Sequence, residues 1–183
     1  MERTRMSGED RKKQILQSAI NVFVEYGYIG STTAEIAKAA NISEVTLFRH
    51  FESKKHIFMA SIEPIVFNTL KESITASKDL NSREKLEYIL KERLMLISKN
   101  REVMKLLIME SQINKELNNL NYIEKMSTLL RTTISEIGIP LKDDEFIMRL
   151  LMGGILSFLY LPEDDEENIE DYVKSIVKII IKD

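Results

Sequence analysis

The chain has 183 residues, of which 44% are apolar, so it can form the core of one ordinary domain or of two small ones. It contains no cysteine, which excludes a disulfide framework, a cysteine-ligated zinc site and a thiol nucleophile. A formal net charge of −3 argues against a polybasic protein that binds nucleic acid over its whole surface. Six Gly and three Pro are too few for a fold built from many tight turns, so the composition predicts a mostly helical protein.

Neither end of the chain carries a membrane signal. Residues 1–6 are charged and polar, with no apolar run behind them, which is not the pattern of a signal peptide. The longest apolar stretches, such as residues 176–181, fall well short of the roughly 20 residues that a membrane span needs. We therefore expect a cytoplasmic protein with no membrane partner.

The first predicted elements are three helices. Apolar residues at helical spacing predict a helix over residues 9–26, and Gly27 follows where a helix usually stops. Thr32 and Glu35 have the spacing of a capping box, in which each side chain accepts a hydrogen bond from a backbone N–H of a new helix. Ser43 is a suitable N-cap for a third short helix. A tight turn is expected between the two short helices.

A longer helix is predicted from Ser53 towards Ser77. We expect a kink at Pro64 because proline removes a helical hydrogen bond and its ring clashes with the preceding turn. Five further helical patterns follow, over residues 83–98, 102–114, 120–137, 143–160 and 167–182. The sequence thus predicts an all-α fold of about nine helices.

The second and third helices have the proportions of a helix-turn-helix. Ala37 is small where the two helices must cross closely, while Ile36 and Leu47 can bury the pair against the first helix. The polar side of the pair would then be free to face a DNA groove. Two amphipathic helices and a turn can also be ordinary packing, so this pattern alone leaves DNA binding open.

Three runs of residues make the prediction more specific. They are Ile15-Leu16-x-x-Ala19-x-x-x-Phe23-x-x-x-Gly27-Tyr28, Thr32-Thr33-x-x-Ile36-Ala37-x-x-Ala40-Asn41-Ile42-Ser43 and Thr46-Leu47-Phe48-Arg49-His50-Phe51-x-Ser53-Lys54. Together they resemble the N-terminal domain of the TetR family of bacterial regulators. The resemblance covers about a quarter of the chain. It implies a DNA-binding domain over residues 1–52 and an effector-binding and dimerisation domain over residues 53–183.

The same resemblance implies which residues contact DNA. The start of the second helix would hold a phosphate with the hydroxyls and backbone N–H groups of Thr32 and Thr33, and Thr32 can serve as the N-cap at the same time. The third helix would read base edges with its first residues, which are Ser43, Glu44, Val45 and Thr46. Glu44 can accept from a cytosine amino group, or it can only complement the helix dipole.

Further phosphate contacts are implied along the third helix and after it. Phe48 stands where the family has a tyrosine, so the phosphate-binding hydroxyl is missing. Arg49 and His50 remain as donors, although His50 can instead pack beside Phe51. Lys54 matches the lysine that the family uses to contact a phosphate.

The resemblance also implies a homodimer on a nearly palindromic double-stranded DNA operator, because one monomer offers few base contacts. The last two long helices would form the dimer surface. Gly153-Gly154 is costly inside a helix unless another backbone approaches closely. The candidate contacts are Leu150, Leu151, Gly154, Phe158, Tyr172, Ile176, Ile179 and Ile180.

The middle helices are rich in methionine and other large apolar residues, which suit an effector pocket because methionine adapts to varied shapes. Ordinary helical core is the alternative for each of them. The candidates are Phe67, Tyr88, Met95, Met104, Leu107, Ile108, Gln112, Tyr122, Met126, Leu130 and Phe146.

We hypothesise a repressor that an apolar or aromatic effector releases from its operator, through a movement of the kinked helix at Pro64. The alternative is a related regulator whose C-terminal helical domain binds a protein instead of a small molecule.

The sequence does not favour an enzyme. It has no glycine-rich phosphate loop, and its two histidines, His50 and His56, lack the spacing of a metal-ligand pair. The acidic runs at residues 143–145 and 163–167 fit helix N-termini and a solvated loop better than a metal site, so we expect no cofactor and no metal. Residues 1–60 hold nine Lys and Arg against seven Asp and Glu, whereas residues 61–183 hold seventeen against twenty-two. The charge that could bind phosphates is therefore local to the N-terminal part.

Overall fold

The computed structural model describes residues 7–65, 69–117, 121–139 and 144–181. Within these ranges the regular structure is entirely helical, which confirms the predicted fold class. The ten α-helices are α1 (Gly8–Gly30), α2 (Thr33–Ala39), α3 (Glu44–His50), α4 (Lys54–Glu63), α5 (Thr69–Ala76), α6 (Ser82–Lys99), α7 (Arg101–Ile113), α8 (Tyr122–Ile137), α9 (Asp144–Tyr160) and α10 (Glu166–Ile180).

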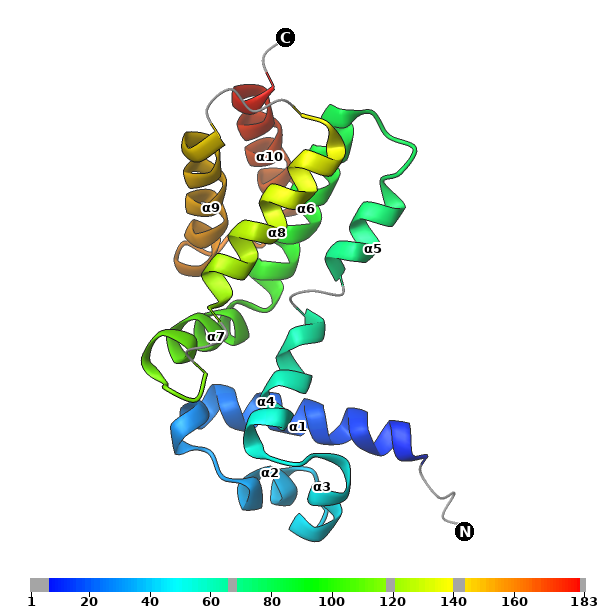
Figure 1. Cartoon of the computed structure of the whole chain (residues 1–183), viewed down its shortest axis with the longest axis vertical. Coiled ribbons are helices and arrows are strands. Elements are labelled where there is room, and N and C mark those ends of the chain that lie inside the picture. The colour runs from blue at the N-terminus through cyan, green and yellow to red at the C-terminus, as the bar shows by residue number, and fades with distance from the viewer. Residues whose placement is uncertain (1–6, 66–68, 118–120, 140–143, 182–183) are drawn as a thin grey trace.

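The helices form a small N-terminal unit and a larger body (Figure 1). In the N-terminal unit, α1 packs against α2 and α4, and α2 packs against α3. In the body, α6 packs against α9 and α10, and α8 lies across α6 and α9. The helix α7 contacts α1 on one side and α8 and α9 on the other, so it joins the two parts. No helix in the described ranges is both long enough and apolar enough to cross a membrane.

Helix α1 differs from its prediction at Gly27. The backbone leaves the helical conformation there, with φ of 72° and ψ of 171°, as the glycine led us to expect. One more helical turn then continues to Gly30. The positive φ is accessible to glycine because it has no Cβ. The prediction of a helix end at this position therefore becomes a kink.

The single kinked helix that we predicted over residues 53–77 is wrong. Helix α4 ends at Glu63, and Pro64 follows as its C-cap in a short π-helical turn. Helix α5 then begins at Thr69, and residues 66–68 lie outside the described residues. Proline ends α4 because it cannot donate the next helical hydrogen bond. This separation makes the number of helices ten instead of nine.

The core of the N-terminal unit is built on aromatic rings. The rings of Phe23 and Phe58 meet edge to face with centroids 5.1 Å apart, and Tyr28 meets Phe58 at the same distance. All three side chains are buried, and edge-to-face pairs of this kind stabilise a core beyond the area that they bury. These contacts fix α4 against the C-terminal end of α1.

Side chains of α10 pack against Gly154 of α9. A Cβ atom at this position would overlap the hydroxyl oxygen of Tyr172 on α10 and lie 3.4 Å from the Cδ1 atom of Ile176. The Tyr172 ring also meets the Phe158 ring edge to face, with centroids 5.1 Å apart. The space beside Gly154 is thus filled by side chains of the same chain and not by another backbone, whereas Gly153 has open space around it.

The variant Gly154→Ala should lower the free energy of unfolding by about 1–3 kcal/mol, since the new methyl group forces Tyr172 out of its packed position. Gly153→Ala is the matched control, and it should be neutral or stabilising by up to about 1 kcal/mol because alanine favours a helix. Urea denaturation measures both variants, with the oligomeric state checked by light scattering. Equal stability of the two variants would contradict the packing described for Gly154.

Candidate nucleic-acid interface

The start of α2 is held by its own side chains. The Thr32 hydroxyl accepts a hydrogen bond from the backbone N–H of Glu35 at 3.1 Å, and the Glu35 carboxylate accepts from the backbone N–H of Thr32 at 2.8 Å. This is the capping box that the sequence predicted. Glu35 thus accepts from both the N–H and the hydroxyl of Thr32, so both donors of Thr32 already have a partner inside the chain.

The turn between α2 and α3 has the geometry of a tight helix-turn-helix connection. Asn41 adopts a positive φ of 52°, and the backbone N–H of Ile42 donates to the carbonyl of Ala37 at 3.0 Å. The Ser43 hydroxyl then caps α3 by accepting from the backbone N–H of Thr46 at 3.2 Å. Asparagine tolerates this left-handed conformation, and the tight turn that we expected is present.

Helix α1 supports the two short helices from behind. The Gln14 side chain donates to the carbonyl of Ala40 at 3.1 Å, which satisfies a carbonyl at the C-terminal end of α2. Ile36 and Leu47 are fully buried and belong to the same apolar cluster as Ile15 and Phe23 of α1. The buried face of α3 is therefore fixed, and its opposite face is left to solvent.

The exposed face of α3 carries most of the predicted base-reading residues. Val45 is 66% exposed and Phe48 is 49% exposed, so two apolar side chains point outward from a seven-residue helix. Ser43 and Arg49 are also exposed. Exposed apolar side chains beside an arginine can contact thymine methyl groups and phosphates together.

On α3 itself, three of the predicted contact residues have partners inside the chain. Glu44 accepts a hydrogen bond from the Thr33 hydroxyl at 2.7 Å, so it links the first turns of α2 and α3. Thr46 is partly buried, and its hydroxyl lies 3.0 Å from the Ser43 hydroxyl. His50 is partly buried as well, with its ring centroid 6.4 Å from that of Phe51.

Lys54 is engaged in the protein at the start of α4. Its ammonium donates to the carbonyl of Tyr28 at 2.7 Å and to the carbonyl of Ser31 at 2.9 Å. It also lies 4.4 Å from the centroid of the Tyr28 ring. Lys54 thus ties α4 to the end of α1, a structural role that its match to a phosphate-binding lysine did not indicate.

Tyr28 is also the point where the N-terminal unit meets the body. Its backbone N–H donates to the Glu110 carboxylate of α7 at 2.8 Å, and its hydroxyl donates to the Glu116 carboxylate at 2.9 Å. Burial, followed by the hydrogen bond to Glu116, raises the pKa of the Tyr28 hydroxyl above its ordinary value. Lys55 adds a donated hydrogen bond to the carbonyl of Glu116 at 2.6 Å.

Glu110 is only 4% exposed, although it carries a carboxylate. A Cβ atom at Gly27 would come within 3.1 Å of its Oε1 atom, so the glycine kink also makes room for this carboxylate. The sequence analysis missed Glu110 and Glu116. The signal that could have found Glu110 is its place among the apolar residues of α7, between Leu107 and Ser111 on the buried side.

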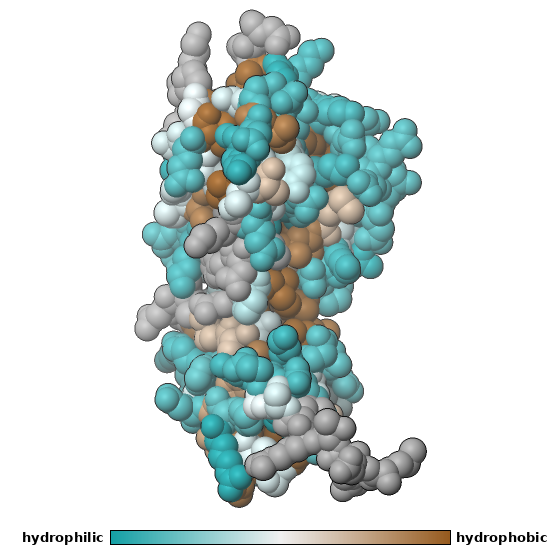
Figure 2. All heavy atoms as spheres, turned by 90° about the vertical axis from the view of Figure 1, so that its right-hand side faces the viewer, coloured by the Kyte–Doolittle hydropathy of each residue, from teal (hydrophilic) through white to brown (hydrophobic). Residues whose placement is uncertain are grey.

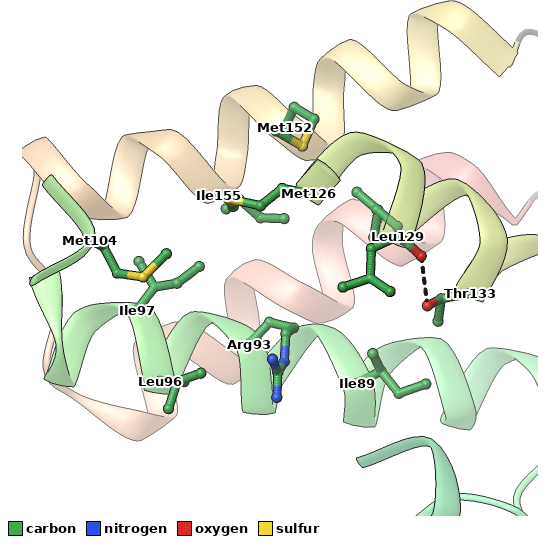
Figure 3. A pocket seen from close by; sticks show the side chains of 11 residues that line it. Ile89, Arg93, Leu96, Ile97, Met104, Met126, Leu129, Thr133, Met152 and Ile155 are labelled. Carbon is green, nitrogen blue, oxygen red and sulfur yellow. Dashed lines mark hydrogen bonds between the residues drawn. The ribbon is translucent and has the colours of Figure 1, made fainter. Parts of the chain in front are cut away.

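The body contains a partly open apolar cavity between α6, α7, α8 and α9 (Figure 3). Its volume is about 60 Å³. Its wall is apolar except for Arg93 and Thr133, and it consists of Ile89, Arg93, Leu96, Ile97, Met104, Met126, Leu129, Leu130, Thr133, Met152 and Ile155. We call this space the α6–α9 cavity.

The predicted pocket residues divide between this cavity and other places. Three of them line the α6–α9 cavity: Met104, Met126 and Leu130. Tyr88 and Met95 line a separate groove between α5 and α6. Leu107, Ile108 and Tyr122 are buried in the core, Gln112 and Phe146 are exposed, and Phe67 lies outside the described residues.

The predicted dimer residues also divide. Within this single chain the buried ones are Leu151, Phe158, Ile176 and Ile180, and the partly buried ones are Leu150, Gly154 and Tyr172. Ile179 is 55% exposed. Side chains on the inner faces of α9 and α10 are covered by the chain itself, because these helices pack against α6.

Among the described residues, no group of three or more His, Asp and Glu side chains could hold a metal ion.

The sequence of this chain resembles those of known proteins. Residues 15–60 match the family model described as "Bacterial regulatory proteins, tetR family", which covers all the helices of the N-terminal unit at least in part. The regulator IcaR of Staphylococcus epidermidis is 25% identical over 93% of this chain and 99% of its own length. The N-terminal unit therefore matches the TetR family of regulators, and the chain is similar to IcaR over nearly its whole length.

Other relatives point to the same family. IcaR of Staphylococcus aureus is 44% identical over 52 residues, which span 28% of this chain and 28% of that protein. Both IcaR proteins are described as negative transcriptional regulators of the biofilm operon icaADBC. TetR family proteins are transcriptional regulators, in agreement with our expectation that this chain is not an enzyme.

Solved structures extend the likeness over the whole TetR fold. A Clostridium perfringens protein, provisionally described as a fatty acid metabolism regulator, is 29% identical with a TM-score of 0.69, over 93% of this chain and 100% of its own. The ketosteroid regulator KstR2 of Mycobacterium tuberculosis shares the fold, with a TM-score of 0.74 and 19% identity over 99% of this chain and 100% of its own.

The variant Glu110→Ala should lower the free energy of unfolding by about 1–3 kcal/mol, because it leaves the buried backbone N–H of Tyr28 without its acceptor. Glu110→Gln keeps an acceptor oxygen and the side-chain volume, so its effect should be smaller.

Glu102→Ala on the exposed side of the same helix serves as the control and should change stability by no more than about 0.5 kcal/mol. Urea denaturation gives all three values. A stability of Glu110→Ala equal to that of the control would show that the hydrogen bond from Tyr28 contributes nothing.

Proposed function

We propose that this TetR family protein is a homodimeric repressor of transcription that binds a palindromic operator in the cytoplasm and leaves it when a small apolar molecule binds the body. The observation that carries the DNA-binding part is the exposed face of α3, where Val45, Phe48 and Arg49 project from a helix held firmly by its N-cap and its buried face. The exposed face of such a helix can enter a major groove. Residues 1–52 would be the reader and residues 53–183 the regulatory body.

The exposed residues support a division of roles on DNA. Val45 can contact a thymine methyl group, and Arg49 can donate to a phosphate or a guanine. Thr33 lies in the first turn of α2, where a phosphate can accept from backbone N–H groups. Glu44 orients this end by its hydrogen bond from Thr33, so it would position the two helices relative to each other. Phe48 offers apolar contact only.

The exposed faces of α9 and α10 support a dimer. Phe146, Leu150, Gly153 and Tyr160 recur at helical spacing along α9, and Ile179 is exposed on α10. These helices lie at the end of the body away from α2 and α3 (Figure 1). Two copies joined there would form a bundle of four helices with open space at Gly153 for close approach. The two copies of α3 would then meet half-sites about one helical turn of DNA apart, or somewhat wider.

Helix α7 supports a link between the body and the reader. Met104 lines the α6–α9 cavity and Glu110 holds Tyr28, and both residues lie on α7. Six residues of helix separate them by about 9 Å. A ligand that moves Met104 would therefore shift the carboxylate that supports the end of α1. This route replaces the movement at Pro64 that we hypothesised from the sequence, because α4 ends there and cannot act as one rigid lever.

The variant Arg49→Ala should weaken operator binding by roughly 1–3 kcal/mol per half-site and lower the slope of log K against log salt by about 1 per arginine. The operator can be found by selecting duplexes from a random-sequence pool with the purified protein, and an inverted repeat is expected. Arg49 is a cleaner test than Lys54, whose removal would also release the end of α1.

Lys78→Ala, an exposed cation in the body, is the control for loss of charge and should leave operator binding unchanged. Fluorescence anisotropy at several salt concentrations measures each variant. The proposal fails if no duplex is enriched, or if Arg49→Ala binds the selected duplex like the unaltered protein.

The variant Ile179→Glu should shift the protein from dimer to monomer, because it replaces an exposed apolar side chain near the C-terminal end of α10 with a charge inside the proposed interface. Ile113→Glu is the matched control, since Ile113 is also an exposed isoleucine, 64% against 55% for Ile179, but lies at the end of α7. Sedimentation velocity measures the oligomeric state of both. A dimer that survives Ile179→Glu, or a monomeric unaltered protein at micromolar concentration, would contradict the proposed interface.

A further inference from the structure

One charged residue lies in the wall of the α6–α9 cavity. Nine of the eleven lining side chains are apolar, and the other two are Thr133 and Arg93. The Thr133 hydroxyl already donates to the carbonyl of Leu129 at 2.9 Å, as Figure 3 shows. Arg93 is therefore the side chain of this wall that can select a ligand by charge.

Arg93 lies between two spaces. It lines the α6–α9 cavity, and together with Leu96 it also lines the groove between α5 and α6. In Figure 3 its side chain rises from α6 beside Ile89, Leu96 and Ile97, while the methionines come from the other helices. A molecule that entered from the groove would pass Arg93 before its apolar part met Met104, Met126 and Met152.

The guanidinium of Arg93 is partly buried, and two carboxylates lie near it. Its Nε atom is buried, and this burial lowers the pKa of Arg93, while the nearby charges of Glu92 and Glu72 act in the opposite direction. Arginine remains protonated despite such a shift, and its five N–H donors exceed what two carboxylates need. Glu92 and Glu72 are exposed to solvent, which screens their attraction for the cation. A cation in this position favours an anionic partner with an apolar body.

The size of the α6–α9 cavity limits the apolar part of that partner. One water needs about 10–15 Å³ on this measure, so 60 Å³ holds only a few atoms without adjustment. Three of the lining residues are methionines, whose unbranched side chains adapt readily to a guest. A slender chain fits this wall better than a wide ring system.

We propose that the α6–α9 cavity binds an anionic amphiphile, with its carboxylate or phosphate head on Arg93 at the α5–α6 groove and its alkyl chain among Met104, Met126 and Met152. The face of the molecule that Figure 2 shows, on the side where α5 lies in Figure 1, exposes hydrophobic surface between hydrophilic side chains. The inference deepens the proposed function, on which it rests, by replacing an apolar effector with a charged one.

Four probes with the same eight-carbon chain test the head group: octanoate, octyl phosphate, octanol and octylammonium. Each is titrated into the full-length protein by calorimetry, below the concentration at which the probe forms micelles. Octanoate or octyl phosphate should bind at least about tenfold more tightly than octanol, because a charged hydrogen bond is added. The tighter of the two anions identifies the head group, and octylammonium should bind most weakly. Equal binding of octanol and both anions, or no binding by either anion, overturns the proposal.

Variants then assign the effect to Arg93. Arg93→Met keeps the apolar stem and should lower anion affinity roughly ten- to a hundredfold while leaving octanol unchanged. Arg93→Lys should recover part of the loss, because it restores a positive charge without the planar fork. Lys85→Gln removes a cation from the same helix away from the cavity and should bind the anions normally. Normal anion binding by a folded Arg93→Met variant, or equal loss in Lys85→Gln, overturns the assignment.

Operator binding separates this inference from the proposed function. Protein without ligand is first tested on the selected duplex, and failure at that step contradicts the repressor function alone. If the duplex is bound, octanoate or octyl phosphate should release it from the unaltered protein, and Arg93→Met should stay bound at the same concentration. Binding of the duplex together with absence of anion binding contradicts the inference and leaves the repressor function standing.

Discussion

The arrangement of this protein depends on three hydrogen bonds at one residue, Tyr28. Its backbone N–H donates to Glu110, its carbonyl accepts from Lys54, and its hydroxyl donates to Glu116. Glu110 and Glu116 belong to the body, whereas Lys54 begins α4, so one residue connects three separate segments. The kink at Gly27 makes this possible, because it turns the N–H of Tyr28 away from α1 and leaves room for the carboxylate.

This junction gives α7 its importance. Helix α7 packs against α1 and also supplies Met104 to the wall of the α6–α9 cavity. The proposed ligand site and the junction at Tyr28 therefore share one helix. The buried Glu110 makes the junction sensitive to small shifts, since a carboxylate in a shielded place depends on the distance to its donor. In contrast, α3 makes its contacts with α2 and α1 and is carried along as part of the N-terminal unit.

Local sequence patterns predicted the ends of the helices in the helix-turn-helix well, but they predicted few of the residues that line the cavity in the body. Thr32, Glu35 and Ser43 cap α2 and α3 as expected, because capping involves residues three apart that are neighbours in any chain that turns there. The wall of the α6–α9 cavity comes from four helices, and only Met104, Met126 and Leu130 of the predicted set belong to it. Helical periodicity tells which face of each helix is buried, but it does not tell which buried faces meet around an empty space.

The sequence by itself determined the fold class, the capped helix-turn-helix and the resemblance to the TetR family, since these follow from short-range spacing and from a specific run of residues. Only the tertiary structure decided that Lys54 holds the end of α1, that Gly154 makes room for Tyr172 and that Arg93 lies beside an apolar cavity. Each of these roles joins residues at least 18 positions apart or different helices. Such pairs are brought together by packing of the whole chain, which no local pattern encodes.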